Sequence, residues 1–404
     1  MTVSEALGAF ITSTEFGDLS AGQVTAAKNA ISDCHGCMIA GSATATATIV
    51  RRVAEVSSAR GASTVIGGMA ALSAQAAALA NGTAAHALDY DDILWTQYGH
   101  PSATVWAAAL AVCEAVGGSG QDVILAYAIG VQINGKLGRL VNPAQYAHGW
   151  HATATVGVIG STAAACKLMG LTPEQTAMAL GVAASEACGV RRNFGTMTKP
   201  FHAGNAARGA VLAAELAREG FTSDLTAFEG EFGWARTLNA RTVPSALELG
   251  VQLRSGWELE QPGIVFKRYP ACGATHCALD AIIAIKNENQ LATDEMEKII
   301  CDASPFAKTV LLYPRPDTGL EGKSWSSASP SLQSKARRDW LSTMTSGSKT
   351  RVCSQRSIVL SSGRALTWNP TCPPTPCLPK CMCMRAARSS AEKCLCHPGI
   401  RATR

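Results

Sequence analysis

Aromatic and charged residues are both scarce in this 404-residue chain, at 6% and 16%, whereas hydrophobic residues make up 47%. This balance indicates a globular protein with well-buried helices. The chain also lacks a long apolar run, because the most apolar stretch, residues 70–80, is dominated by alanine and is too short to span a bilayer. An acid at Glu5, with no basic region ahead of an apolar stretch, predicts no secretory signal. We therefore expect a cytoplasmic protein with no membrane partner.

Cysteine is present but unevenly distributed. Eight of the 15 cysteines lie singly or in loose pairs in the first 301 residues, at positions typical of helix interiors, where cysteine acts as a small hydrophobe. The other seven fall between Cys353 and Cys396. This distribution argues against a disulfide framework.

Charge divides along the chain in the same way. Residues 324–404 carry 13 Lys and Arg against 2 Asp and Glu, whereas residues 1–323 carry 22 against 28. A basic tail on an acidic body is typical of proteins that bind nucleic acid or a membrane surface. The tail departs from the rest of the chain in other ways, described below, and we expect no nucleic-acid partner.

Alanine and glycine are plentiful, and such small residues allow helices to pack closely. Helical periodicity runs to about residue 250, and Thr172-Pro-Glu-Gln175 predicts a capping box at a helix start. After Pro262 the pattern alternates between helix and strand. We predict a mainly α fold with two domains, a large all-helical domain over residues 1–263 and a smaller α+β domain over residues 264–323.

Four polar segments hold candidate functional residues. The first contains His86, Asp89, Asp91 and Asp92, followed by His100 before a proline. Three carboxylates and a histidine would supply a proton acceptor and a proton donor together. Alternatively, Asp91 and Asp92 end one helix while the Pro-Ser pair after His100 starts the next.

The second segment holds His148 and His151 ahead of a glycine-bearing helix. The dipole at a helix N-terminus lowers the pKa of a histidine, which favours a neutral imidazole that serves as a general base. The alternative is an ordinary polar residue at a helix cap.

The third segment contains Lys199, His202, Gly204 and Arg208. Its basic side chains would form a compact cationic site for carboxylates, and the glycine would allow a ligand to approach closely. Lys199 precedes a proline, which predicts an extended backbone there. The alternative is a solvated loop that leads into a helix over residues 205–218.

The fourth segment runs from Lys267 to His276, and His276 opens a helix. Cys272 and His276 have a spacing suited to a metal, but no second ligand pair at a matching interval exists in residues 1–323, so we predict no metal site. The sequence also lacks a glycine-rich nucleotide loop after a strand and a Ser/His/Asp nucleophile pattern.

In their order and spacing, these segments resemble the signature set of the MmgE/PrpD family, which includes 2-methylcitrate dehydratases and cis-aconitate decarboxylases. The matching runs, with a later one at residues 313–323, are HALDYDD, GHPSAT, HGWHATATVGVIGSTAAACKLMGL, TKPFHAGNAARGA, KRYPACGATHCALDA and YPRPDTGLEGK. The resemblance implies a large helical domain with an α+β lid, a homodimer, an active site between the domains, and no cofactor or metal. It also implies a lyase that acts on a small di- or tricarboxylic acid such as 2-methylcitrate or cis-aconitate.

Carried onto this sequence, the resemblance implies catalytic roles for five residues, namely Asp89, His100, His151, Lys199 and His276. Lys199, with His202 and Arg208, would bind the substrate carboxylates. We hypothesise that His100 and His151 form the acid–base pair. Ile93 stands where some cis-aconitate decarboxylases have threonine, which weakens decarboxylation relative to dehydration. An epimerase or racemase of a small dicarboxylate, and an inactive family member that acts as a binding protein, are alternative functions.

The resemblance stops after Lys323, so the lid domain is predicted to be incomplete. Residues 324–404 form an aberrant tail rich in Ser, Arg and Cys, without clear periodicity or a standard zinc spacing. One DNA sequence that encodes residues 325–330 encodes a second peptide when an A precedes it and reading starts at that A, one base earlier. This second peptide resembles the family's continuation. We interpret the tail as the product of a reading-frame shift, or as disordered, and expect low stability and weak or absent activity.

Overall fold

The computed structural model describes residues 1–290, 301–313 and 318–322, together with three short strands further along the chain. The chain divides into two compact units. The first unit consists of Met1–Asn193 and Met197–Lys267, and the second contains Phe194–Thr196 and the described residues from Arg268 onward. The predicted boundary at residue 264 and the predicted tail over residues 324–404 stay predictions, and most of the tail lies outside the described residues.

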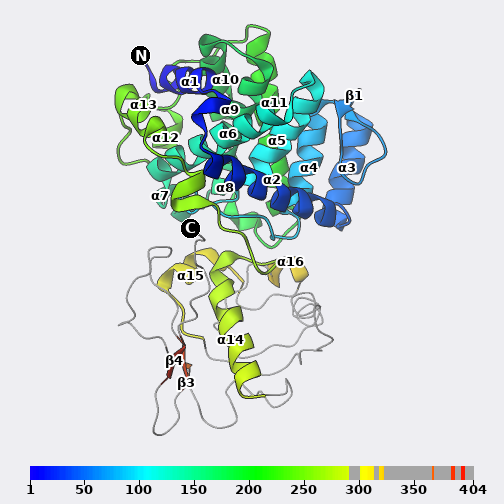
Figure 1. Cartoon of the computed structure of the whole chain (residues 1–404), viewed down its shortest axis with the longest axis vertical. Helices are drawn as coiled ribbons and strands as arrows, with labels where there is room; N and C mark the ends of the chain where they lie inside the picture. Colours follow the sequence, from blue (N-terminus) through cyan, green and yellow to red (C-terminus); the bar gives the residue numbers. More distant parts are fainter. Residues whose placement is uncertain (291–300, 314–317, 323–365, 368–383, 387–392, 396–404) are drawn as a thin grey trace. The chain divides into compact units, whose positions relative to one another are not determined.

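The first unit is built almost entirely of helices (Figure 1), which confirms the predicted mainly α fold. Its α-helices are α1 (Val3–Ser13), α2 (Ala21–Gly41), α3 (Ala45–Ser57), α4 (Ala74–His86), α5 (Pro101–Val116), α6 (Gly120–Val141), α7 (Ala144–Ala147), α8 (Ala152–Thr155), α9 (Gly157–Met169), α10 (Pro173–Ser185), α11 (Thr198–Arg218), α12 (Trp234–Thr237) and α13 (Ala246–Arg254). Shorter elements are η1 (Phe16–Asp18), β1 (Arg60–Ser63), η2 (Arg191–Asn193) and η3 (Leu259–Gly263).

The helix ends follow local sequence signals. The Thr172 hydroxyl accepts a hydrogen bond from the Gln175 backbone N–H, and the Gln175 Oε1 accepts one from the Thr172 backbone N–H. This pair of bonds confirms the predicted capping box of α10. The preceding helix, α9, ends at Gly170, whose φ of +65° is a left-handed conformation that glycine adopts without steric cost.

One local prediction is wrong. Lys199 was expected on an extended backbone, but α11 begins at Thr198 and includes both Lys199 and His202 in its first turns. Proline is tolerated in the first turn of a helix, because the N–H that it lacks would have no intrahelical partner there. The early start places both side chains on a rigid element.

Helices α4 and α11 pack against each other through small residues. A Cβ atom added at Gly204 would lie 2.2 Å from the backbone oxygen of Leu79, and one added at Gly82 would lie 2.9 Å from the Gly204 Cα. Only glycine allows so close an approach. His86 follows Gly82 by about one turn and His202 precedes Gly204, so the crossing brings the end of α4 beside the start of α11.

The described part of the second unit contains η4 (Gly273–Thr275), α14 (His276–Glu288), α15 (Pro305–Val310) and α16 (Gly319–Gly322). It also contains β2 (Leu366–Thr367), β3 (Met384–Ala386) and β4 (Lys393–Leu395), which form an antiparallel sheet in the order β2-β3-β4. His276 opens α14, as the sequence predicts. The Tyr313 hydroxyl donates a hydrogen bond to the Phe194 carbonyl within this unit.

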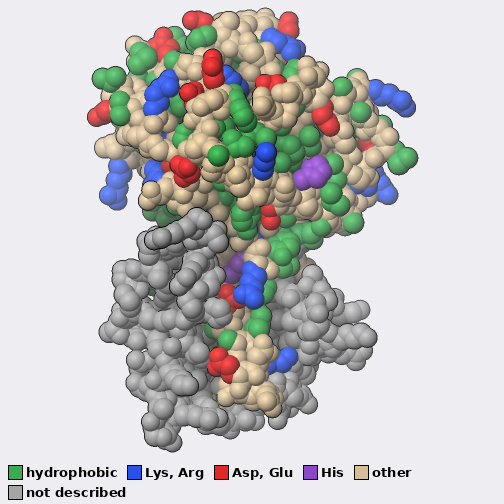
Figure 2. All heavy atoms as spheres, in the orientation of Figure 1, with side chains coloured by type: hydrophobic (Ala, Val, Ile, Leu, Met, Phe, Trp, Pro, Cys, Tyr) green, Lys and Arg blue, Asp and Glu red, His purple; other side chains and the backbone are tan. Residues whose placement is uncertain are grey.

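The surface of the helical unit carries intermixed acidic and basic side chains on the face shown in Figure 2. Among the described residues, Ala152–Met169 is long and apolar enough to cross a membrane by length and composition. Neighbouring helices bury 83% of this segment, and a core helix of a helical protein meets the same criteria.

Candidate functional site

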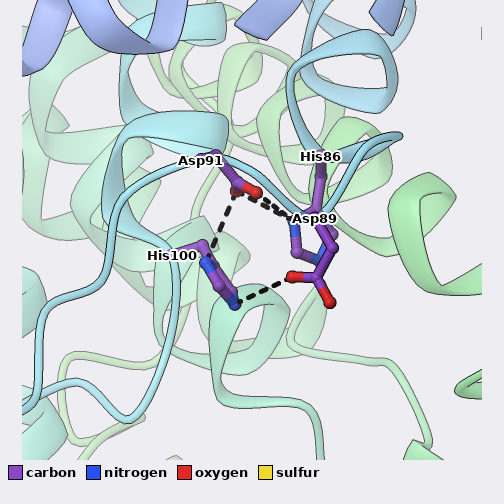
Figure 3. A group of neighbouring side chains, drawn as sticks. All are labelled: His86, Asp89, Asp91 and His100. Atoms are coloured by element: carbon purple, nitrogen blue, oxygen red, sulfur yellow. Dashed lines mark hydrogen bonds and ion pairs between the residues drawn. The ribbon is translucent and has the colours of Figure 1, made fainter. Parts of the chain in front are cut away.

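The end of α4, the turn after it and the start of α5 bring four ionisable side chains together (Figure 3). His86 is the last residue of α4, Asp89 and Asp91 lie in the following turn, and His100 is the N-cap residue of α5. The His86 Nδ1 lies 2.8 and 2.9 Å from the two Asp91 carboxylate oxygens. The His100 Nε2 lies 3.9 Å from Asp89 Oδ1, and its Nδ1 lies 3.6 Å from Asp91 Oδ2.

Asp89 is held by two lysines from distant parts of the sequence. The Lys199 Nζ donates to Asp89 Oδ2 at 2.6 Å, and the Lys267 Nζ donates to Asp89 Oδ1 at 2.6 Å and to the Asp89 backbone oxygen at 2.8 Å. Asp89 has a φ of +52°, which is uncommon for a residue other than glycine. Burial opposes ionisation of Asp89, but the two ammonium groups hold the pKa of its carboxyl well below the usual range.

Lys267 reaches this position through an irregular segment. The backbone N–H groups and oxygens of Val265 and Ile93 exchange two hydrogen bonds of 2.9 Å, which fix the segment beside the turn after α4. The Lys267 side chain is fully buried. A buried ammonium group requires a paired anion, and Asp89 supplies it.

Two further histidines extend the group of imidazoles. The Nδ1 atoms of His151 and His202 lie 3.1 Å apart, so one of the two nitrogens is protonated and donates a hydrogen bond that the other accepts. The His151 ring centroid lies 5.7 Å from that of His86, and the His86 centroid lies 4.6 Å from that of His100. The four rings therefore form a continuous histidine row from His202 to His100.

Burial keeps the imidazoles of His100, His151 and His202 neutral. It lowers the pKa of His100 to about 3 and that of His202 to about 4, with nearby cationic groups adding to the effect. Burial, followed by the neighbouring histidines, also lowers the pKa of His151 well below its ordinary value. Neutral imidazoles accept protons, so the site holds several bases beside two fixed ammonium groups.

The hydrogen bonds assign tautomers to two of the rings. The ionised Asp91 carboxylate can only accept, so His86 carries a proton on Nδ1. The backbone oxygen of Asp92 also can only accept, and it lies 2.7 Å from the His100 Nδ1, so that nitrogen is protonated as well. The His100 lone pair is therefore on Nε2, the nitrogen that faces Asp89.

A metal ion is the other chemistry that this arrangement suggests. One potential ligand atom from each of His86, Asp89, Asp91 and His100 lies within 4.8 Å of the others. Both carboxylate oxygens of Asp89, however, already accept hydrogen bonds of 2.6 Å from ammonium groups, whose positive charge would repel a cation. The donor set therefore fits a site for anions better than a site for a metal.

The structure brings together most, but not all, of the residues singled out in the sequence. Asp89, His100, His151, Lys199 and His202 share the site, whereas Arg208 lies elsewhere on α11, in an ion pair of 3.6 Å with Glu186. Nine residues separate Arg208 from Lys199, so the helical repeat places the two side chains roughly 180° apart around the axis. His276 belongs to the second unit, where its Nε2 lies 3.3 Å from the Ala271 backbone oxygen.

Lys267, His86 and Asp91 stand in the candidate segments, but sequence reasoning assigned no individual role to Lys267 or His86 and named Asp91 only as one of three carboxylates. All three occur within the motif runs quoted above, so position within a motif was the available signal. Their participation depends on tertiary contacts, since Lys267 lies 178 residues from Asp89.

Comparison with known proteins places the fold in a family. Residues 5–245 match the MmgE/PrpD N-terminal domain, which covers more than half of the chain. The chain belongs to the MmgE/PrpD family. The match contains the elements that carry the histidine row, Asp89 and Lys199, whereas Lys267 follows it.

Several MmgE/PrpD proteins with a curated activity are similar to this chain. It is 30% identical to the human cis-aconitate decarboxylase over 313 residues, which are 74% of this chain and 64% of that protein. The mouse cis-aconitate decarboxylase is 30% identical over 319 residues, and that of Aspergillus terreus is 31% identical over 234 residues. The chain spans about 64% of the length of the two mammalian relatives.

Proposed function

We propose that this protein is a lyase for a small polycarboxylate, and that its reaction is the decarboxylation of an unsaturated tricarboxylic acid such as cis-aconitate. The observation that carries this proposal is the buried histidine row beside two lysines that converge on Asp89. The decarboxylase activity of several relatives supports the choice of substrate.

The ammonium groups of Lys199 and Lys267 favour an anionic substrate, because they can donate charge-assisted hydrogen bonds to it. Asp89 and Asp91 compensate these two charges, while the imidazoles of His100, His151 and His202 are neutral. A substrate carboxylate would compete with Asp89 for the two ammonium groups through charge-assisted hydrogen bonds. Its negative charge would also raise the pKa of the neighbouring imidazoles, so binding would draw a proton into the histidine row.

That proton is the one the reaction needs. Cleavage of the C–C bond to one carboxylate releases CO₂ and leaves the electron pair on the substrate carbon. An imidazolium then donates its proton to that carbon, and the imidazole recovers a proton from solvent. His151 and His100 are the proposed acid–base pair, because both rings lie in one histidine row and the charge of a bound carboxylate would raise their lowered pKa values toward the range suited to proton transfer.

The test is turnover of cis-aconitate by the purified full chain, followed by NMR. His100→Gln and His151→Gln should each lower the turnover rate by at least about tenfold, because each removes a proton-transfer group. His148→Gln is the matched control, since this exposed ring lies outside the site, where its Nδ1 lies 3.0 Å from the Ala144 backbone oxygen. Near-normal turnover in both site variants would contradict the assignment.

Dehydration of a hydroxylated acid such as 2-methylcitrate is the second candidate function. Ile93, which replaces the threonine found in some cis-aconitate decarboxylases, is buried in this structure beside Val265. In dehydration, one histidine removes the proton next to a carboxylate and the other protonates the departing hydroxyl, which leaves as water. The same NMR experiment with 2-methylcitrate separates the two, since only decarboxylation releases CO₂.

A further inference from the structure

Asp92 adjoins the site and forms hydrogen bonds through both its side chain and its backbone oxygen. Its side chain is fully buried, and its two carboxyl oxygens accept hydrogen bonds from the Ser102 backbone N–H at 3.4 Å and from the Ser102 hydroxyl at 2.5 Å. Its backbone oxygen accepts the hydrogen bond from the His100 Nδ1. One residue therefore contacts both the start of α5 and the imidazole that precedes it.

A tyrosine from another helix completes this arrangement. The Tyr127 hydroxyl, on α6, lies 2.6 Å from the Ser102 hydroxyl, and the Tyr127 side chain is fully buried. The chain of contacts runs from α6 through the first turn of α5 to the turn after α4. Each link is a hydrogen bond between buried groups, and such bonds are costly to leave unmade.

We propose that Asp92, supported by Ser102 and Tyr127, is a positioning residue that fixes the His100 ring in the tautomer with a bare Nε2. The carboxylate anchors the Asp92 peptide to the start of α5, so its backbone oxygen is held 2.7 Å from the His100 Nδ1. A carbonyl can only accept, so it selects the imidazole protonated at Nδ1. The Nε2 lone pair then faces Asp89, the residue that pairs with both lysines and beside which a substrate would bind.

Simple helix capping is the competing explanation. Asp92 does satisfy N–H and hydroxyl groups in the first turn of α5, and a cap alone would stabilise the fold without affecting the His100 tautomer. The two explanations differ in what they predict for the His100 ring. A spectroscopic test of the ring therefore distinguishes them, and it requires no turnover.

The experiment is ¹⁵N NMR of the full chain labelled at histidine, in which His100→Gln identifies the His100 signals. We expect the pyridine-type signal of His100 to belong to Nε2. In Asp92→Ala this signal should lose intensity in favour of the other tautomer. Asp92→Asn retains an acceptor for the Ser102 N–H and should restore the pattern, while Ser102→Ala and Tyr127→Phe should give smaller shifts.

Asp122→Asn is the matched control, because Asp122 caps the neighbouring helix α6 through Ser119 and lies outside the site. It should leave the His100 signals unchanged while lowering stability. Unchanged His100 signals in folded Asp92→Ala would overturn the proposal. If that variant does not fold, unchanged signals in both Ser102→Ala and Tyr127→Phe would overturn it equally.

The kinetic consequence rests on the proposed function. Asp92→Ala should lower kcat by at least about tenfold with little change in KM, because Lys199 and Lys267 still bind the carboxylates. A parent protein without turnover would contradict the proposed function and leave the NMR result to decide the role of Asp92. A KM increase with unchanged kcat would contradict the positioning role.

Discussion

Asp89 joins the two cationic side chains of the site. Its left-handed backbone directs the carboxylate to Lys199, on α11, and to Lys267, beside the turn after α4. Each lysine Nζ lies 2.6 Å from a different carboxylate oxygen, so the two ammonium groups are held close together. A pair of cations that both contact one carboxylate group suits an anionic ligand that can take the place of Asp89.

Lys267→Gln should weaken both stability and substrate binding. It removes the charge-assisted hydrogen bonds from Lys267 to the carboxylate and to the backbone oxygen of Asp89, which corresponds to a loss of about 1–3 kcal/mol in the free energy of unfolding. A similar loss of binding energy should raise KM by about tenfold or more. Denaturant unfolding and steady-state kinetics measure the two effects.

Lys136→Gln is the matched control for this prediction. Lys136 is also nearly buried, with 12% of its side chain exposed, and it forms an ion pair of 3.5 Å with Glu258, outside the site. Its loss should affect stability and leave KM near the parent value. An equal KM increase in both variants would show that Lys267 acts only through the fold.

The sequence predicts individual site residues better than it predicts their partners. Asp89, His100 and Lys199 stand in short polar motifs within a helical pattern, and such residue types in such positions indicate chemistry locally. The pairing of Asp89 with Lys267 depends on a contact across 178 residues, which no local pattern contains. Arg208 shows the opposite error, because proximity in sequence suggested a shared site and the helical repeat directs it to Glu186.

At the scale of elements, helix ends are encoded locally and helix crossings are not. The capping box at Thr172 and the left-handed Gly170 follow from adjacent residues, and both were predictable. The crossing of α4 and α11 depends on Gly82 and Gly204, two glycines whose sequence neighbours give no sign of the contact.

Gly204→Ala tests this crossing. The new Cβ would lie 2.2 Å from both the Leu79 backbone oxygen and the Thr83 hydroxyl, so α4 and α11 must move apart. Overpacking of this kind costs about 1–3 kcal/mol in the free energy of unfolding. Turnover should also fall, because Lys199 and His202 on α11 would shift away from His86 at the end of α4. Chemical denaturation and turnover assays measure both effects.

Gly36→Ala is the control for a glycine in a helix. Gly36 is exposed on α2, and a Cβ there would have no atom within 4 Å outside its own helix. Alanine should therefore stabilise the protein by about 0.5–1 kcal/mol. Stabilisation by Gly204→Ala would contradict the close crossing that the structure shows.

At the scale of the whole molecule, the buried site links folding to pH. The folded state holds His202 with a pKa of about 4, below the ordinary value of 6.5 that applies after unfolding. As pH falls below about 6.5 the unfolded chain binds a proton that the folded protein does not bind, so stability decreases. This contribution is fully present above pH 6.5 and is lost as pH falls toward 4.

His202→Gln should therefore become relatively more stable as the solution is acidified. Its melting temperature relative to the parent protein should rise as pH falls from about 6.5 to about 4, and the difference should be constant above that range. Differential scanning calorimetry across pH 4–8 measures it. A difference that does not change with pH would show that His202 titrates alike in the folded and unfolded states.

Asp92 should have the opposite effect over an overlapping pH range. Burial raises the pKa of Asp92 to about 8, so the folded protein retains a proton that the unfolded chain releases near its ordinary value of 3.8. The resulting stability is present below about pH 3.8 and is lost as pH rises toward 8. Asparagine resembles the protonated carboxyl and does not titrate, so the melting temperature of Asp92→Asn relative to the parent should rise from pH 4 to pH 8. A relative melting temperature that falls over this range would mean that the buried carboxyl is ionised, and that the Ser102 hydroxyl and N–H stabilise its charge.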